Sequence, residues 1–132
     1  MRGRKEGLIV RDAHYPGRAP IDAYGNSGFR FADMSHVGSV LCVPSGIYGW
    51  SPVSADELDQ SAFETVFAES SNIEVLLIGT GPALVRIKPE LRDMFRSKGI
   101  MADSMSTGAA VRTFNVLLAE NRAVAACLLA VD

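Results

Sequence analysis

The sequence predicts an α/β domain of three layers, built on a mixed, mostly parallel central sheet with an N-terminal β-hairpin. Three apolar runs typical of buried strands, at 37–43, 73–78 and 100–105, each end in a turn of small residues. Each turn precedes a stretch of helical character, as in chains that alternate strands and helices. A chain of 132 residues, 48% of them hydrophobic, can bury such a core without a disulfide or a metal.

The N-terminal segment differs in composition from the rest of the chain. We expect residues 1–19 to form a partly ordered basic arm and residues 20–132 to form a single domain. Residues 1–18 carry five basic and two acidic side chains, whereas residues 31–85 carry seven acidic side chains and no Lys or Arg. Affinity for nucleic acid comes largely from neutralising phosphates, so the net charge of −2 argues against nucleic-acid binding.

The first expected elements of the domain are β-structure. Residues 21–24 and 29–31 form a predicted hairpin, because Gly25-Asn26-Ser27-Gly28 between them supplies residues that accept positive φ. The strand 37–43 follows. We expect residues 44–52 to form a loop rich in aromatic side chains.

Helix signals are clear in the middle of the chain. Residues 54–57 and 61–64 match the capping-box pattern, and the second is expected to open a helix with one apolar face. A helix is predicted over Pro89–Lys98, because proline suits its first turn and Gly99 suits the position just past its end. The run 73–78 between these helices is typical of a central strand covered on both faces.

The C-terminal part continues the alternation. A strand at 100–105 precedes a predicted helix over 107–120, and residues 122–131 form the last strand. The sequence leaves the direction of this last strand open, since it could lie parallel to its neighbours or close the sheet antiparallel.

Membrane, redox and metal functions are not favoured. The longest apolar run, 123–131, has nine residues, against the ~20 that a membrane-spanning helix needs. No apolar stretch follows the basic N-terminus as in a secretory signal, so we expect a soluble cytoplasmic protein. Cys42 and Cys127 lie in apolar runs without metal-ligand spacing, so buried reduced thiols are expected, with a redox or metal role as the alternative. No cofactor is predicted.

Two turns are candidate ligand sites. The turn Gly79-Thr80-Gly81-Pro82 resembles the start of a nucleotide-binding loop, but the third glycine and the Gly-Lys-Ser/Thr signature are missing. Thr80 therefore belongs either to a tight turn or to a ligand loop. Ser106, Thr107 and Gly108 open the helix 107–120, where they would cap the helix, bind an anion, or do both.

The predicted helix also presents polar residues opposite its apolar face. Gly108, Arg112 and Asn115 share that side. Arg112 would bind a carboxylate or phosphate through two nitrogens, or would pair with Asp103 or a backbone carbonyl. Ser45 and Asp103 are the other polar candidates at the strand ends, which parallel strands would bring together at one edge.

The aromatic loop is the candidate surface for a protein partner. Ile47, Tyr48 and Trp50 lie close together in sequence. If exposed, they would anchor a partner, and if buried, they would cap the end of the sheet.

Four motifs in order resemble a small family of uncharacterised prokaryotic proteins whose mitochondrial relatives act as an assembly factor for respiratory complex I. The similarity runs from about residue 8 to the C-terminus. The motifs are Ile21-Asp22-Ala23-Tyr24-Gly25, Pro44-Ser45-Gly46-Ile47-Tyr48, Leu77-Ile78-Gly79-Thr80-Gly81, and Thr107-Gly108-Ala109-Ala110 followed by Arg112-Thr113-Phe114-Asn115-Val116-Leu117. The resemblance implies a three-layer α/β fold and a bacterial origin, since eukaryotic members carry a targeting sequence. It implies no enzymatic activity or cofactor for these residues.

Two functions follow as hypotheses. The first is a non-catalytic protein-binding or assembly factor that holds its partner through the aromatic loop, with a respiratory complex as the candidate target. The second is a small-molecule site or enzyme that binds an anionic ligand in a crevice at the carboxyl ends of the strands. The sequence leaves the oligomeric state open.

Overall fold

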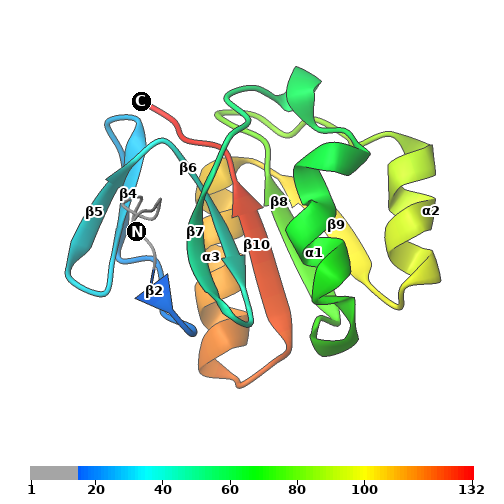
Figure 1. Ribbon diagram of the computed structural model, residues 1–132. Coiled ribbons are helices and arrows are strands. Elements are labelled where there is room, and N and C mark those ends of the chain that lie inside the picture. The colour runs from blue at the N-terminus through cyan, green and yellow to red at the C-terminus, as the bar shows by residue number, and fades with distance from the viewer. Residues whose placement is uncertain (1–14) are drawn as a thin grey trace, which may run out of the picture.

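A computed structural model of the protein describes residues 15–132, which form three layers around a six-stranded sheet (Figure 1). The expected basic arm lies outside the described residues except for 15–19. The strands of the central sheet are, in spatial order, β2 (Tyr15–Pro16), β7 (Gly46–Trp50), β6 (Ser39–Val43), β10 (Val124–Leu128), β8 (Val75–Gly79) and β9 (Met101–Met105). The predicted three-layer α/β fold is confirmed.

The sheet is mixed, as predicted, but its three antiparallel pairs outnumber its two parallel pairs, so the expectation of a mostly parallel sheet does not hold. Strands β8, β9 and β10 are parallel to one another, with Val124 opposite Val75 and Val75 opposite Met101. Strand β6 runs antiparallel to β10, β7 to β6, and β2 to β7. The last strand, whose direction the sequence left open, is therefore parallel to β8, while the pairings beyond it are antiparallel.

The first apolar run, predicted as one strand over 37–43, is divided between two sheets. Gly38 has φ +103°, a conformation that few residues other than glycine adopt. The chain turns there, so that Val37 ends β5 with 84% of its surface exposed while Val40 in β6 is fully buried. Hydrophobicity alone could not reveal this change of sheet.

A three-stranded sheet extends the predicted hairpin. It consists of β3 (Ala23–Gly25), β4 (Gly28–Phe31) and β5 (Met34–Val37), all antiparallel. Asn26 and Ser27 have positive φ in the first turn, the conformation of the tight hairpin turns that follow the twist of the strands. Phe29 and Phe31 are buried, so this small sheet closes one side of the core.

The segment 44–52 is a strand and not the expected loop. Residues 46–50 form β7, which pairs with β6 along its whole length, Cys42 opposite Ile47. Pro44, Gly46 and Gly49 are typical of loops, but pairing on both sides with β6 and β2 decides the conformation. The prediction failed because strand formation here depends on tertiary neighbours.

Helices cover both faces of the central sheet. The helix α1 (Glu64–Ala68) and the helix α2 (Pro89–Ser97) lie on one face, and α3 (Thr107–Ala119) lies on the other (Figure 1). One apolar core contains Phe63 and Phe95, and a second contains Phe31 and Phe114. The helix predicted over 89–98 is found as α2, and Gly99 follows it with φ +79°.

The region before α1 consists of short 3-10 helices. They are η1 (Ala55–Glu57) and η2 (Gln60–Phe63), and a third, η3 (Ser70–Asn72), follows α1. Ser54 makes no capping hydrogen bond with its side chain. Asp59 caps η2 instead, by accepting from the Ala62 amide, while the Ser61 hydroxyl donates to Asp59 at 2.6 Å. The capping-box pattern thus found a helical start but misassigned its cap.

Candidate functional site

The turns that follow the apolar runs 37–43, 73–78 and 100–105 were expected to meet at one end of the sheet. They lie at two opposite ends of it. The turns after β8 and β9 lie together, because these strands are parallel, and the Thr107 amide donates to the Gly81 carbonyl at 2.8 Å. Strand β6 runs the other way, so the turn at Pro44-Ser45 is at the far end of the sheet. The expected convergence of three turns is therefore wrong for Ser45.

Thr107 is a buried residue whose hydroxyl connects distant segments of the chain. It is fully buried, its hydroxyl donates to the Leu129 carbonyl at 2.7 Å, and it accepts from the Gly81 amide at 3.0 Å. A Cβ on Gly79 would meet the Thr107 Cα at 3.0 Å. Glycine at position 79 therefore allows α3 to begin directly against β8.

Thr80 also has a structural role. Its hydroxyl faces the carbonyls of Ala83 and Met105 at 2.7 and 3.1 Å, and accepts from the Val85 amide at 2.9 Å. This set of bonds holds the chain after β8 in its turn. Of the two interpretations of the Gly79–Pro82 segment, the structure matches the tight turn.

A cavity of about 480 Å³ lies where α3 begins. It is lined by Tyr24, Gly81, Pro82, Ser106, Gly108, Arg112 and residues 130–132. Ser106 caps α3 by accepting from the Ala109 amide at 3.3 Å. Arg112 is exposed, and its guanidinium makes no ion pair or hydrogen bond to another residue within 15–132. The cavity brings together Ser106, Gly108 and Arg112, as the sequence predicted.

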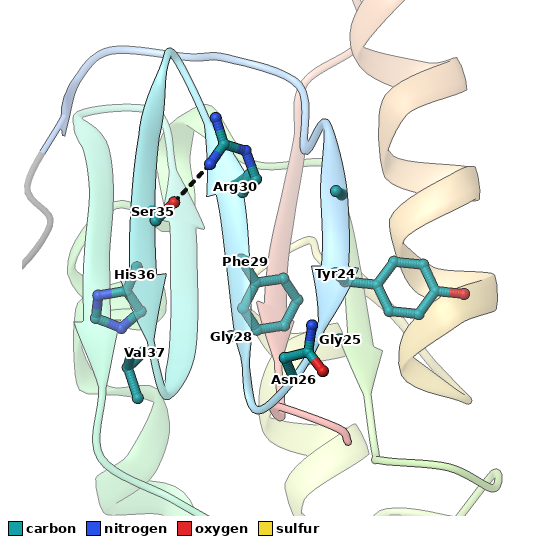
Figure 2. Close-up of a pocket in the computed structure, with 10 residues that line it drawn as sticks. Tyr24, Gly25, Asn26, Gly28, Phe29, Arg30, Ser35, His36 and Val37 are labelled. Carbon is teal, nitrogen blue, oxygen red and sulfur yellow. Dashed lines mark hydrogen bonds between the residues drawn. The ribbon is translucent and has the colours of Figure 1, made fainter.

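Tyr24 covers the first turn of α3. A Cβ on Gly108 would collide with the Tyr24 hydroxyl, and Figure 2 shows the Tyr24 ring extending from β3 toward α3. Glycine at 108 therefore provides the room that the phenol ring occupies. Tyr24 was not among the site residues predicted from the sequence, although it lies within one of the motifs that carry the family resemblance.

Asn115 and Asp103 do not reach this cavity. The carboxamide of Asn115 accepts from the Ile21 amide at 2.9 Å and donates to the Ile21 carbonyl at 2.8 Å. The Asn115 side chain thus bonds both backbone polar groups of Ile21, as a residue of a neighbouring strand would. These two bonds join the segment before β3 to α3. Asp103 is exposed on β9 and forms no ion pair with Arg112.

Ser45 forms a separate polar group at the opposite edge. Its hydroxyl donates to a Glu69 carboxylate oxygen at 2.6 Å, and its amide donates to the other oxygen at 3.0 Å. The Tyr48 hydroxyl lies 2.7 Å from the Ser45 hydroxyl. Glu69 thus joins the end of α1 to the β6–β7 turn.

Two of the three aromatic-loop candidates are core residues. Ile47 is 1% exposed and Trp50 is 9% exposed, and the Trp50 indole donates to the Ala62 carbonyl at 2.8 Å. Because side chains alternate along β7, Ile47 enters one core and Trp50 the other. Burial, the second interpretation above, therefore holds for both, and Tyr48 is half-buried.

The two thiols are free and buried. Burial raises the pKa of the Cys42 thiol to about 12 and raises that of Cys127 well above its ordinary value. Thiols held in the protonated form are poor nucleophiles and poor metal ligands. Within residues 15–132, no three His, Cys, Asp or Glu side chains gather as a metal site would require.

A second hollow lies on the three-stranded sheet (Figure 2). It has a volume of about 250 Å³. The Arg30 guanidinium donates to the Ser35 hydroxyl at 2.8 Å, and His36 Nε2 lies 3.0 Å from the Ser39 carbonyl. Each of these two side chains thus contacts the strand that follows its own in the chain.

A groove between α1 and α2 was also not predicted from the sequence. Its volume is about 590 Å³, and Phe67 and Met94 from the two helices line it. The signal was present, since each of these residues lies at the edge of an apolar helix face. Apolar residues at such positions commonly belong to the core, so the sequence pattern alone does not show that they line a groove.

The chain matches a known protein family over most of its length. Residues 21–129 match the family described as "Protein of unknown function (DUF498/DUF598)". An uncharacterized protein of Rhodobacter capsulatus is 34% identical over 122 residues, which are 92% of this chain and 93% of that protein. A solved structure from Bartonella henselae, described as an outer membrane protein, is 63% identical with a TM-score of 0.86, covering 89% of this chain and 99% of that chain.

A eukaryotic relative has a described role. NADH dehydrogenase (ubiquinone) 1 alpha subcomplex assembly factor 3 of Xenopus tropicalis is 30% identical over 109 residues, which are 83% of this chain. The match spans 60% of the length of that relative.

No helix within residues 15–132 is long and apolar enough to cross a membrane. The family match and the relative in Rhodobacter capsulatus show that this chain belongs to the DUF498/DUF598 family, as its motifs predicted.

Proposed function

We propose that this protein is a non-catalytic binding factor that assists the assembly of a larger protein complex, with a respiratory complex as the first candidate. The observation that carries the proposal is the similarity, over 83% of this chain, to a relative described as an assembly factor for NADH dehydrogenase. Homology thus supports an assembly role at the level of the family. That the complex assembled is a respiratory one is our proposal for this chain.

The hydrogen bonds of the polar candidate residues support a binding role over a catalytic one. The hydroxyls of Thr80 and Thr107 and the carboxamide of Asn115 are engaged by backbone groups of this chain. They stabilise the fold and have no spare capacity to activate a substrate.

A small anionic ligand is the second candidate. The specific observation is that Arg112 has no partner within residues 15–132 and lines the cavity with Ser106 and Gly108. An unpaired guanidinium favours carboxylate or phosphate groups. Asp132 lines the same cavity, and its negative charge opposes an anion, so this candidate ranks second.

One experiment separates the two candidates. The tagged full-length chain is purified gently from its native host, and mass spectrometry identifies retained proteins and small molecules. A stoichiometric protein, above all a subunit of a respiratory or membrane complex, supports the assembly function. A bound metabolite without a protein contradicts it, and Arg112→Ala should then abolish retention of that metabolite.

We propose that the protein acts in the cytoplasm. Both cysteines are free thiols, as is usual in a reducing compartment, but the relative from Bartonella henselae is described as an outer membrane protein. Fractionation of host cells decides the matter. Recovery of the untagged chain in the outer membrane fraction would contradict a cytoplasmic location.

A further inference from the structure

The groove between α1 and α2 has an apolar floor of defined shape. Phe67 stacks on Phe95, with ring centroids 5.0 Å apart and an interplanar angle of 18°. Because Phe95 is fully buried, it holds the Phe67 ring in place. Met94 forms the other side and is half-buried. Its unbranched thioether adapts to the shape of a bound side chain.

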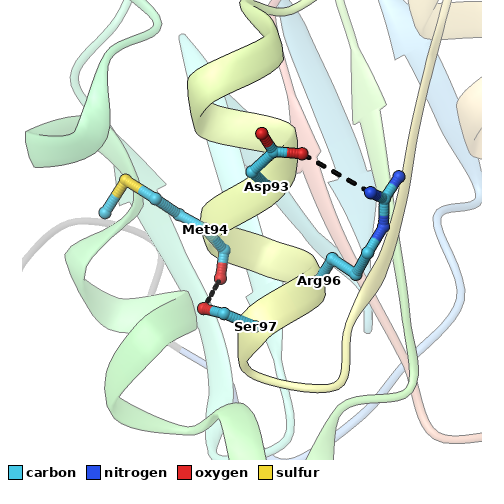
Figure 3. A network of polar contacts seen from close by, with 4 residues as sticks. All are labelled: Asp93, Met94, Arg96 and Ser97. Carbon is cyan, nitrogen blue, oxygen red and sulfur yellow. Dashed lines mark hydrogen bonds and ion pairs between the residues drawn. The ribbon is translucent and has the colours of Figure 1, made fainter.

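Figure 3 shows how α2 separates its apolar and charged sides. The Met94 side chain extends from α2 toward α1, whereas Arg96 extends to the other side and pairs with Asp93 at 3.5 Å. Arg96 therefore does not neutralise the groove. The basic side chain that lines it is Lys98, at the carboxyl end of α2.

The rim on the α1 side is acidic. Asp59 and Glu64 line the groove and are exposed, and Asp56 and Glu57 precede them in the chain. The Ser61 hydroxyl and nearby amides hold the pKa of Asp59 below its usual range, so this carboxylate is charged at neutral pH. Since residues 31–85 contain no Lys or Arg, no basic side chain of this segment offsets the charge.

We propose that this groove binds a segment of a partner protein in which an apolar side chain lies next to Arg or Lys. The apolar side chain enters between Phe67 and Met94, and the basic side chain reaches Asp59 and Glu64. The inference rests on the proposed function, because it names the surface through which the assembly factor holds its partner.

The dimensions and charge of the groove favour this occupant. A volume of about 590 Å³ lies in the range of sites that hold a few side chains, so a short segment fills it. A carboxylate rim attracts cations and repels acidic segments. Residues 31–85 of a second copy of this chain are themselves acidic, so the carboxylate rim would repel them as well.

The test uses the full-length chain with 13C-labelled methionine methyl groups. The probes are two peptides, acetyl-Arg-Leu-Leu-Arg-amide and acetyl-Glu-Leu-Leu-Glu-amide, each titrated to millimolar concentration. We expect the Met94 methyl signal to shift with the basic peptide and much less with the acidic one. The Met101 methyl, 73% exposed on β9, is the internal control and should not move.

Charge reversal provides the second measurement. Glu64→Lys should weaken binding of the basic peptide about fivefold, because a favourable exposed charge pair becomes a repulsive one. Glu74→Lys makes the same change of net charge on an exposed acidic residue outside the groove lining, and should change the affinity less than twofold, roughly. Unfolding by urea confirms that both variants remain folded.

Several outcomes overturn the inference. They are an unmoved Met94 signal, equal shifts with both peptides, equal effects of Glu64→Lys and Glu74→Lys, or a Met94 shift that follows protein concentration and so reveals a second copy. Failure here is distinct from failure of the assembly function. A partner that co-purifies equally with the wild type and with Glu64→Lys leaves the assembly function standing and removes the groove from it.

Discussion

The hydroxyl of Thr107, in the first turn of α3, donates a 2.7 Å hydrogen bond to the carbonyl of Leu129, just beyond the end of β10. The same oxygen accepts from the Gly81 amide at 3.0 Å. One buried side chain thus joins the segments that follow β8, β9 and β10. The cavity that contains Arg112 is built on this junction.

Removing the Thr107 hydroxyl should destabilise the protein. Thr107→Val keeps the shape but leaves a buried amide and a buried carbonyl without their partner, which costs about 3 kcal/mol in the free energy of unfolding. Thr107→Ser keeps the hydroxyl and should cost about 1 kcal/mol for the lost methyl group. Urea unfolding measures both. Equal losses would show that the hydrogen bonds contribute nothing.

The Asn115 carboxamide should control local order at the start of the domain. Asn115→Ala removes both hydrogen bonds to Ile21 and should lower the free energy of unfolding by about 2 kcal/mol. Hydrogen exchange of the Ile21 amide should become faster. Asn115→Asp keeps an acceptor for that amide, so protection should be greater than in the alanine variant. Unchanged exchange in Asn115→Ala would contradict this role.

Tyr24 and Gly108 should be energetically coupled. Alanine favours a helix over glycine by up to about 1 kcal/mol, but a Cβ at 108 displaces the Tyr24 ring. Gly108→Ala should therefore stabilise the Tyr24→Ala variant more than it stabilises the wild type. A double-mutant cycle from urea unfolding measures the difference. A coupling energy of zero would show that the ring moves aside without cost.

The buried thiols should make stability fall at alkaline pH. The pKa of Cys42 is raised from 9.0 to about 12, so between these values the unfolded thiol loses its proton while the native thiol keeps it. The contribution of Cys42 is complete below pH 9 and declines toward pH 12, by about 1.4 kcal/mol per pH unit. Urea unfolding against pH should show a shallower slope in Cys42→Ala. An Ellman reagent should react at pH 8 only after unfolding.

Local sequence signals predicted the helices and strands whose boundaries depend on nearby residues. Proline at 89 and glycine at 99 mark the ends of α2 to within a residue, and the apolar run that becomes β8 needs no neighbour to identify it. β7 was missed because Gly46 and Gly49 carry little strand preference of their own. Its conformation comes from hydrogen bonds to β6 and β2, which no local pattern reports.

The candidate site was predicted in part for the same reason. Gly108 and Arg112 lie four residues apart in α3, so helical periodicity places them on one side, and Ser106 caps the same helix. Ser45 was misplaced because its position depends on the direction of β6. The roles of Thr80 and Asn115 in the fold depend on contacts with residues distant in sequence, Met105 and Ile21.

The sequence by itself determined the α/β class, the start and end of the long helices, the burial of the thiols and the family. Hydrophobic periodicity and capping act over a few residues, so they can be found in the chain alone. Only the tertiary structure decided the direction of β6 and β10, the strand at 46–50, and the groove between α1 and α2. Strand direction and grooves depend on which distant segments pair, and pairing energy is shared between segments that are far apart along the chain.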